Sequence, residues 1–130
     1  MRARELTSVR VTEAFEIELT TGEGDERHVR LRVPARSRFF EGHFEGRPML
    51  PGVAQVVAIA QREAERTFGA LGTPRRMSRL KFQDVIVPGD ALALTLTREV
   101  GDGTLVRFRI ERLLPEGARI ASSGTITYGE

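Results

Sequence analysis

The sequence predicts an α+β fold in which one long helix packs on an antiparallel sheet of five or six strands. Several segments alternate apolar and polar residues, as half-buried strands do, and one segment repeats apolar residues at helical spacing. Clusters of glycine, proline and aspartate separate these segments and mark turns. With 130 residues and no repeat or linker, residues 1–130 fit one domain.

The first segments predict an antiparallel hairpin. The first strand is indicated by apolar residues at alternating positions, namely Val9, Val11, Phe15, Ile17 and Leu19. A turn is expected over Thr21 to Asp25, which includes two glycines. The second strand follows as Val29, Leu31 and Val33, and Pro34 ends it.

A shaped loop and the only predicted helix come next. Three glycines and two prolines within Phe39 to Gly52 exclude regular structure there. The helix is expected over Val53 to Phe68, with Pro51 beside its start and Gly69 beside its end. Its early turns carry an apolar face made of Val53, Val56, Val57 and Ala60.

Four long antiparallel strands are predicted after the helix. The first covers Met77 to Val87, and a turn at Pro88-Gly89-Asp90 leads to alternating Leu92, Leu94 and Leu96. A turn at Gly101-Asp102-Gly103 precedes the third strand, and one at Pro115-Glu116-Gly117 precedes the fourth. The third strand contains Val106, Phe108 and Ile110, and the fourth runs from Ile120 to Tyr128.

Composition excludes several classes of protein. The net charge is only +2 and the arginines are spread along the strands, which argues against a nucleic-acid-binding protein. Met1 to Glu13 has no apolar run and no stretch is long enough to span a membrane, so we expect a cytoplasmic protein. The absence of cysteine removes disulfides and thiol chemistry. A mildly basic surface suits an acidic partner such as an acyl carrier protein.

Two features around the loop could carry chemistry. His43 lies between glycines in the loop, and a sheltered neutral imidazole can take up a proton and later return it. The first backbone amides after Pro51 have no acceptor within the helix and carry the positive end of its dipole. Such amides can hold a thioester carbonyl oxygen as it becomes enolate-like. Gly52 would allow a substrate to approach the backbone closely.

The segment Gly42 to Val53 resembles the GHFPGxPxLPGV motif of bacterial 3-hydroxyacyl-thioester dehydratases, and Leu80 to Asp90 resembles their LKFxxxVxPGD element. The resemblance covers nearly the whole chain and is closest to the dehydratases of aryl polyene pathways. It implies a hot-dog fold, with the sheet wrapped around the long helix and two protomers paired. It implies a role in fatty acid, polyketide or aryl polyene metabolism, and we expect no cofactor. No metal is expected either, because no second histidine or acidic cluster offers metal-ligand spacing.

The resemblance also implies roles for individual residues. His43 matches the histidine that removes the C2 proton of a 3-hydroxyacyl thioester, and Gly52 matches the glycine whose amide holds the thioester carbonyl. The substrate site would further include Phe44, Val53, Val57 and Gln61.

Two positions depart from the family pattern. The family's helix acid corresponds to Val57, and loss of general acid catalysis typically costs a factor of about 100 to 10,000. Glu45 replaces the proline of the motif and could orient His43 or supply the missing acid, although a solvated loop glutamate is the simpler interpretation. Gln61, one helical turn beyond Val57, can donate a hydrogen bond but cannot give up a proton at neutral pH.

These observations leave three hypotheses. The first is a dehydratase, a lyase acting on thioesters of acyl carrier protein or coenzyme A with His43 as base. The second is a catalytically degenerate relative that binds acyl thioesters or serves as the partner subunit of an active, acid-bearing homologue. The third, a hot-dog thioesterase, would need Glu45 to attack or to activate water. In each case we expect a homodimer, because pairing protects the sheet edges, while a heterodimer stays open.

Overall fold

The computed structural model describes residues 4–5, 10–11, 15–35 and 49–130 of the chain. Its long strands are β3 (Glu16–Glu23), β4 (Glu26–Arg32), β5 (Thr73–Phe82), β6 (Ala91–Val100), β7 (Thr104–Leu114) and β8 (Gly117–Gly129). Two short strands, β1 (Arg4–Glu5) and β2 (Arg10–Val11), each pair with β3. The predicted α+β architecture with six long strands is confirmed.

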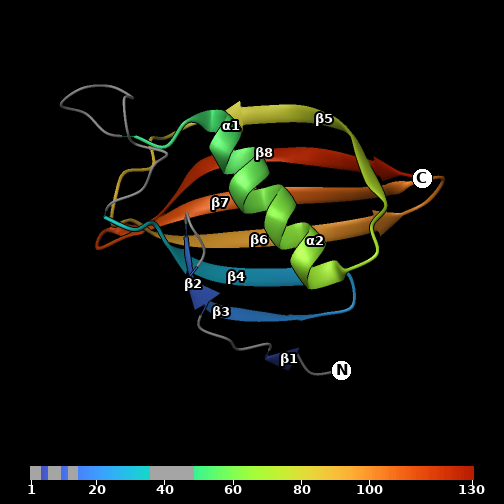
Figure 1. Cartoon of the computed structure of the whole chain (residues 1–130). Coiled ribbons are helices and arrows are strands. Elements are labelled where there is room, and N and C mark those ends of the chain that lie inside the picture. Colours follow the sequence, from blue (N-terminus) through green and yellow to red (C-terminus); the bar gives the residue numbers. More distant parts are fainter. Residues whose placement is uncertain (1–3, 6–9, 12–14, 36–48) are drawn as a thin grey trace.

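All strands are antiparallel and join one sheet in the order β1-β3-β4-β6-β7-β8-β5. Strand β5 follows the helix in the chain but lies at the far edge, where it pairs with the last strand, β8. Figure 1 shows the helix crossing one face of this sheet, with α1 close to β5. Contacts of Phe68 and Arg66 with strands β4 and β3 place the other helix end at the opposite side of the sheet.

The helix is continuous over residues 52–68 and consists of α1 (Gly52–Ala54), a π-helical middle segment (Gln55–Gln61) and α2 (Arg62–Phe68). The wider turns of a π-helix are rare over such a length. The buried helix residues recur every four positions, as Gln55, Ile59 and Glu63 and as Val56, Ala60 and Ala64.

The predicted apolar face of the helix therefore divides into two. Val56 and Ala60 are buried against the sheet, whereas Val53 is 70% exposed and Val57 is 44% exposed. The buried helix residues pack on the concave face of the sheet, whose core consists of Val29, Leu31, Leu92, Leu94, Leu96, Val106, Phe108, Ile110, Ile126 and Tyr128. Val53 and Val57 are left on the open side of the helix.

Several predicted boundaries were wrong, including the start of the last strand, which begins at Gly117 and not at Ile120. Thr21 to Glu23 belong to strand β3, and the turn is confined to Gly24 and Asp25, because these three residues continue the pairing with β4. The strand expected over Met77 to Val87 instead covers Thr73–Phe82. After Phe82 the chain leaves the sheet, because the backbone amides of Gln83 and Asp84 both donate to the carbonyl of Ala121. The turn around Pro88 and Gly89 is confirmed.

Candidate active site

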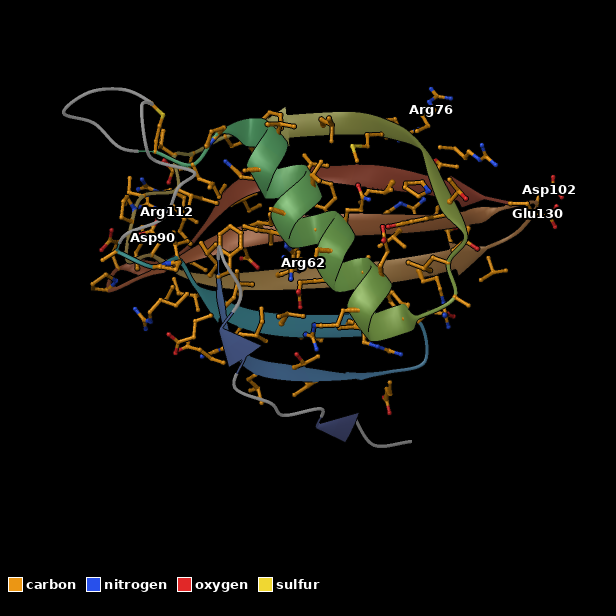
Figure 2. The ribbon with its side chains drawn as sticks, viewed as in Figure 1. Arg62, Arg76, Asp90, Asp102, Arg112 and Glu130 are labelled. Atoms are coloured by element: carbon orange, nitrogen blue, oxygen red, sulfur yellow. The ribbon has the colours of Figure 1, made fainter. Side chains whose placement is uncertain are left out.

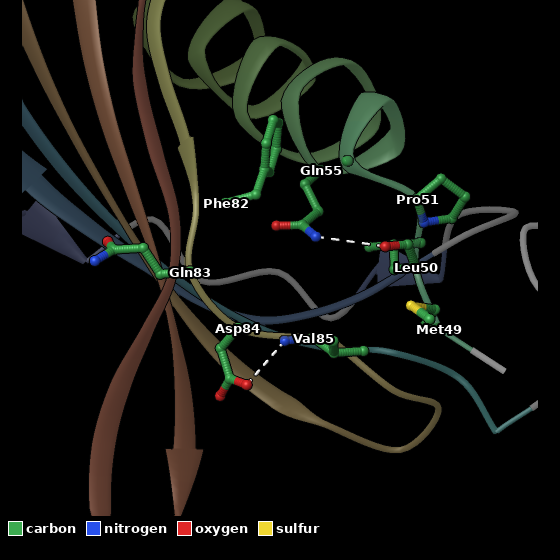
Figure 3. Close-up of a pocket in the computed structure, with 9 residues that line it drawn as sticks. Met49, Leu50, Pro51, Gln55, Phe82, Gln83, Asp84 and Val85 are labelled. Atoms are coloured by element: carbon green, nitrogen blue, oxygen red, sulfur yellow. Dashed lines mark hydrogen bonds between the residues drawn. The ribbon is translucent and has the colours of Figure 1, made fainter. Parts of the chain in front are cut away.

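A pocket opens where the N-terminal end of the helix meets the end of strand β5. Its volume is about 570 Å³. Figure 3 shows the residues that line it, which are Met49, Leu50, Pro51, Gly52, Gln55, Phe82, Gln83, Asp84 and Val85. Most of these side chains are apolar, so the pocket suits an acyl group better than a charged one.

Backbone hydrogen bonds connect the two walls of the pocket. The amide of Leu50 donates to the carbonyl of Ile86 over 2.8 Å, which joins the segment before the helix to the segment after β5. The amide of Gly89 donates to the carbonyl of Val33, and the amide of Val33 donates to the carbonyl of Asp90. The pocket walls are therefore attached to strand β4 as well as to each other.

A partly buried ion network holds the wall formed by residues 83–87. Arg112 of β7 donates to Asp90 over 2.8 Å and to Asp84 over 3.0 Å. Asp84 also accepts the amide of Val85, and Asp90 accepts the amide of Val87. Figure 2 shows Arg112 and Asp90 together at this end of the sheet. The segment is thus fixed by side chains that lie far apart in the sequence.

This network shifts the acid–base equilibria of its members. Partial burial alone would raise the pKa of Asp84, but the Val85 amide and the Arg112 guanidinium outweigh it and hold that pKa below its ordinary value. The hydrogen bond to Asp90 raises the pKa of Arg112, with a further contribution from Asp84. Asp84 and Arg112 therefore stay charged at neutral pH.

The backbone of Gly52, the first residue of the helix, lines the pocket. A Cβ atom at this position would lie 3.0 Å from the ring of Phe82, which is tighter than an ordinary contact. Ala54 and Gln55 donate their amides to the carbonyl of Pro51, whereas no acceptor is present among the described residues for the amides of Gly52 and Val53. These two amides are available to an anionic or carbonyl oxygen.

Gln55 lies one turn further along the helix and is 3% exposed. Its side-chain nitrogen donates to the carbonyl of Leu50 over 3.4 Å. Its side-chain oxygen is buried and has no partner among the described residues. In the part of the chain that the structure describes, the pocket therefore contains one buried hydrogen-bond acceptor that is not satisfied.

The predicted site residues fall into three groups. Gly52 lines the pocket, as expected from the motif. Val53, Val57 and Gln61 lie on the helix but do not line this pocket. His43, Phe44 and Glu45, as well as the turn-rich segment before Pro48, lie outside the described residues.

Sequence reasoning missed most of the pocket wall. Phe82, Asp84 and Val85 belong to the segment that resembles the second family element, but no role was predicted for them. No role was predicted for Gln55 either, since nothing in the sequence says that its oxygen is buried. The one available signal was the PGD turn, whose Asp90 anchors Arg112.

Metal sites and membrane spans are both absent from the described residues. No group of three or more His, Cys, Asp or Glu side chains within the described ranges is arranged to hold a metal ion. No helix among those residues is long and apolar enough to cross a membrane.

Comparison with known proteins gives a consistent result. Residues 19–125 match the family model of ApeI-like proteins, described as ApeI dehydratase. A 3-hydroxyacyl-(acyl carrier protein) dehydratase, FabZ, of Streptococcus pyogenes serotype M5 is 33% identical over 102 residues, which cover 74% of this chain and 72% of that protein.

Two solved structures cover almost the entire chain. One is the dehydratase heterocomplex ApeI:P from Xenorhabdus doucetiae, with a TM-score of 0.70, 24% identity and coverage of 98% of this chain and 97% of that chain. The other is an uncharacterized protein from Erwinia carotovora subsp. atroseptica, with a TM-score of 0.70, 30% identity and coverage of 97% and 94%. These likenesses confirm the hot-dog fold expected from the motif.

Proposed function

Because this chain belongs to the ApeI-like dehydratase family, we propose that it removes water from 3-hydroxyacyl thioesters of an acyl carrier protein or of coenzyme A. The observation that carries the proposal is the apolar pocket beside Gly52, where two backbone amides without acceptors among the described residues begin a long helix. Amides in this position stabilise the negative charge that develops on a thioester oxygen when the C2 proton is removed. The related FabZ enzymes share one third of the aligned residues.

In the proposed reaction His43 takes the proton from C2, and the thioester oxygen accepts hydrogen bonds from the first helix amides. The C3–O bond then breaks, the electron pair of the former C2–H bond forms the double bond, and the leaving hydroxide needs one proton to become water. In this chain Val57 cannot supply that proton. The proton comes either from the His43 imidazolium, which returns what it took, or from an acid outside this segment of the helix.

The exposed side of the helix favours the second source of the proton, an acid supplied by another chain. Val53 and Val57 project from that side and are exposed to solvent. Strand β5 has no neighbour on its outer edge in the described sheet, and it carries exposed Leu80 and Phe82. An open edge next to exposed apolar side chains favours pairing with another sheet. We infer that the active unit is a pair of hot-dog chains joined through this side.

The identity of the second chain has two candidates. A second copy would give the expected homodimer, whereas a homologue with an acid at the position of Val57 would complete the site of this chain. The related ApeI protein of Xenorhabdus doucetiae was solved in a heterocomplex named ApeI:P. Strand β5 carries Arg75, Arg76, Arg79 and Lys81 and no acidic residue, so two copies paired along it would repel each other.

A second function is favoured by Val57 itself. Without an acid at this position the chain could be the non-catalytic subunit of a pair, contributing its pocket and His43 while the homologue contributes the proton donor. The pocket would then bind the acyl group even where the isolated chain shows no turnover. We place this function second because the family model that matches residues 19–125 is described as a dehydratase.

The test is dehydration of short 3-hydroxyacyl thioesters, and the reverse hydration of enoyl thioesters, followed by mass spectrometry. We expect turnover by the wild type, its loss in His43→Ala, and at least tenfold faster turnover in Val57→Asp. His28→Ala is the matched control, because the other histidine of the chain lies on strand β4, is exposed and contacts Glu26. Its turnover should equal that of the wild type.

The outcomes separate the two functions. Turnover that persists in His43→Ala contradicts the proposed mechanism. A silent wild type with turnover restored by Val57→Asp supports the non-catalytic function. A wild type and a Val57→Asp variant that are both silent, alone and with acid-bearing homologues, would overturn the assignment as a dehydratase.

A further inference from the structure

We propose that Gln55 is a substrate-recognition residue whose side-chain oxygen accepts a hydrogen bond from a hydroxyl group on the bound acyl chain. The pocket beside Gly52 would thereby prefer hydroxylated acyl groups over saturated acyl groups of the same length. This inference rests on the proposed function, because it assumes that the pocket holds the acyl part of a thioester.

The side-chain oxygen of Gln55 is buried and unsatisfied within the described part of the chain. Gln55 is 3% exposed, and its oxygen has no hydrogen-bond partner among the described residues. Buried polar atoms in proteins are almost always hydrogen-bonded, and one that is not is destabilising. Because this atom belongs to a residue that lines a pocket, a ligand or a water in the pocket is the natural source of the missing donor.

The surroundings of the Gln55 side-chain amide determine its orientation. The Gln55 nitrogen donates to the carbonyl oxygen of Leu50, which can only accept. Rotating the amide by half a turn would bring two oxygens together and break that bond. The nitrogen is therefore held by Leu50, and Figure 3 shows the oxygen on the opposite side of the amide, directed away from Leu50.

No other side chain of the described pocket lining competes with Gln55 for a ligand hydroxyl. Met49, Leu50, Pro51, Phe82 and Val85 are apolar, so their side chains offer no hydrogen bond. The other polar residues of the lining are directed elsewhere or already bonded. Figure 3 shows the Gln83 amide pointing away from Gln55, and the Asp84 carboxylate accepts from Val85 and Arg112.

The spacing between Gly52 and Gln55 along the helix suits a 3-hydroxyacyl group. Three residues of helix separate them, which corresponds to a rise of roughly 4.5 Å along the axis. In a 3-hydroxyacyl thioester two carbons, C2 and C3, lie between the carbonyl carbon and the hydroxyl oxygen. One acyl group can therefore place its carbonyl at the first amides of the helix and its hydroxyl near Gln55.

An acceptor at this place has a consequence for the reaction. The 3-hydroxyacyl substrate carries a hydroxyl donor, whereas the enoyl product has none. Gln55 would then bind substrate more tightly than product and assist product release. A hydroxyl further along the acyl chain would satisfy the same oxygen, so the shared chemistry is an acyl hydroxyl and its position is decided by experiment.

The experiment measures binding and not turnover. The ligands are pantetheine conjugates in which an amide replaces the thioester, so that the C2 proton is retained, and they carry butanoyl, 3-hydroxybutanoyl or 4-hydroxybutanoyl groups. Isothermal titration calorimetry gives the dissociation constants for the wild type, for Gln55→Met and for Gln83→Met. Methionine has nearly the shape of glutamine but accepts no strong hydrogen bond.

We expect the wild type to bind one of the hydroxylated ligands about tenfold more tightly than the butanoyl ligand, as one hydrogen bond would provide. The preference should disappear in Gln55→Met and persist in the control Gln83→Met. The isomer that is preferred identifies the source of the hydroxyl. A wild type without preference, or a preference that survives in Gln55→Met, would overturn the proposal.

Two further readouts separate this inference from folding and from the proposed function. Gln55→Met removes the unsatisfied oxygen together with the 3.4 Å hydrogen bond to the Leu50 carbonyl, and these two changes oppose each other, so the variant should unfold within a few degrees of the wild type. A cooperative transition near that temperature shows that lost selectivity is not caused by misfolding. Failure of the dehydration assay would leave a hydroxyl preference intact. Conversely, active enzyme with unchanged selectivity in Gln55→Met would reject the role of Gln55 alone.

Discussion

The two ends of the helix differ in how completely their polar groups are bonded. At the C-terminal end Glu63 is buried and its carboxylate lies 2.6 Å from Arg66, which also donates to Thr20 of strand β3. The hydroxyl of Thr67 donates to the carbonyl of Glu63. At the N-terminal end the Gln55 oxygen has no partner among the described residues, and Val53 is mostly exposed.

Aromatic contacts strengthen the same contrast. The guanidinium of Arg27 lies 4.5 Å from the centre of the Phe68 ring and that of Arg98 lies 4.8 Å from it, and Arg27 donates to the carbonyl of Thr67. The last turn of the helix is therefore attached to strands β4 and β6. We infer that the C-terminal end contributes mainly to stability, while the N-terminal end keeps open contacts that a ligand or a second chain can use.

The largest loss of unfolding free energy is expected at Glu63. Replacing Glu63 with alanine leaves the partly buried Arg66 without its carboxylate, and breaking a buried ion pair from one side typically costs about 3 to 5 kcal/mol of unfolding free energy. Glu65→Ala is the matched control, because Glu65 is exposed and, among the described residues, its side chain makes one contact, at 3.2 Å with the Tyr128 hydroxyl. Removing this carboxylate leaves the buried Tyr128 hydroxyl without its partner, so we expect a smaller loss of about 1 to 2 kcal/mol.

Urea unfolding followed by circular dichroism measures both variants. A loss at Glu63→Ala no larger than that at Glu65→Ala would show that the C-terminal end of the helix is not held by this pair. The contrast between the two helix ends would then have to rest on the aromatic contacts of Phe68 alone.

An intermediate effect is expected from Asp84, which holds the pocket wall. Its pKa in the folded protein is lowered, so its contribution to stability is fully present above the unfolded pKa of about 4 and is lost as the pH falls through the lowered folded value. Asp84→Asn should therefore be less stable than the wild type at pH 7, and the difference should shrink between roughly pH 5 and pH 2.

Unfolding free energies at several pH values test this expectation. Asp102→Asn is the matched control, because Asp102 lies in the exposed connection between β6 and β7 (Figure 2). Its difference from the wild type should stay close to zero throughout. A difference for Asp84→Asn that stays constant down to pH 2 would mean that the charge of Asp84 does not stabilise the wall.

The smallest effect on stability is expected at the open side of the helix. Val53→Ser should change the unfolding free energy of a single chain by less than about 0.5 kcal/mol, because the side chain is already 70% exposed. If this side pairs with a second chain, the same substitution should weaken pairing at least tenfold. Light scattering after size-exclusion chromatography, with a dilution series, measures the dissociation constant.

A matched control uses another exposed valine. Val100 is 72% exposed and lies at the end of β6, next to the connection that contains Asp102. Val100→Ser should leave pairing unchanged. Equal pairing of Val53→Ser, Val100→Ser and the wild type would exclude the open side of the helix as the contact surface.

Much of this protein could be predicted from its sequence because the signals are local. Alternating apolar residues identify strands β4, β6 and β7, and the Gly-rich and Pro-rich turns separate them. The helix was predicted over Val53 to Phe68, one residue from its observed start. The loop motif and the PGD element identified the family, since each places several residues of fixed type at fixed spacing.

Tertiary structure decided what depends on contacts between distant segments. Helical spacing shows that Val53, Val56, Val57 and Ala60 share an apolar character, but only packing on the sheet and the wider π-helical turns separate the buried pair from the exposed pair. Arg112 meets Asp84 and Asp90 across strands, so no sequence spacing announces that contact. The unsatisfied oxygen of Gln55 likewise exists only because folding removes water from one side of the amide and supplies a partner to the other.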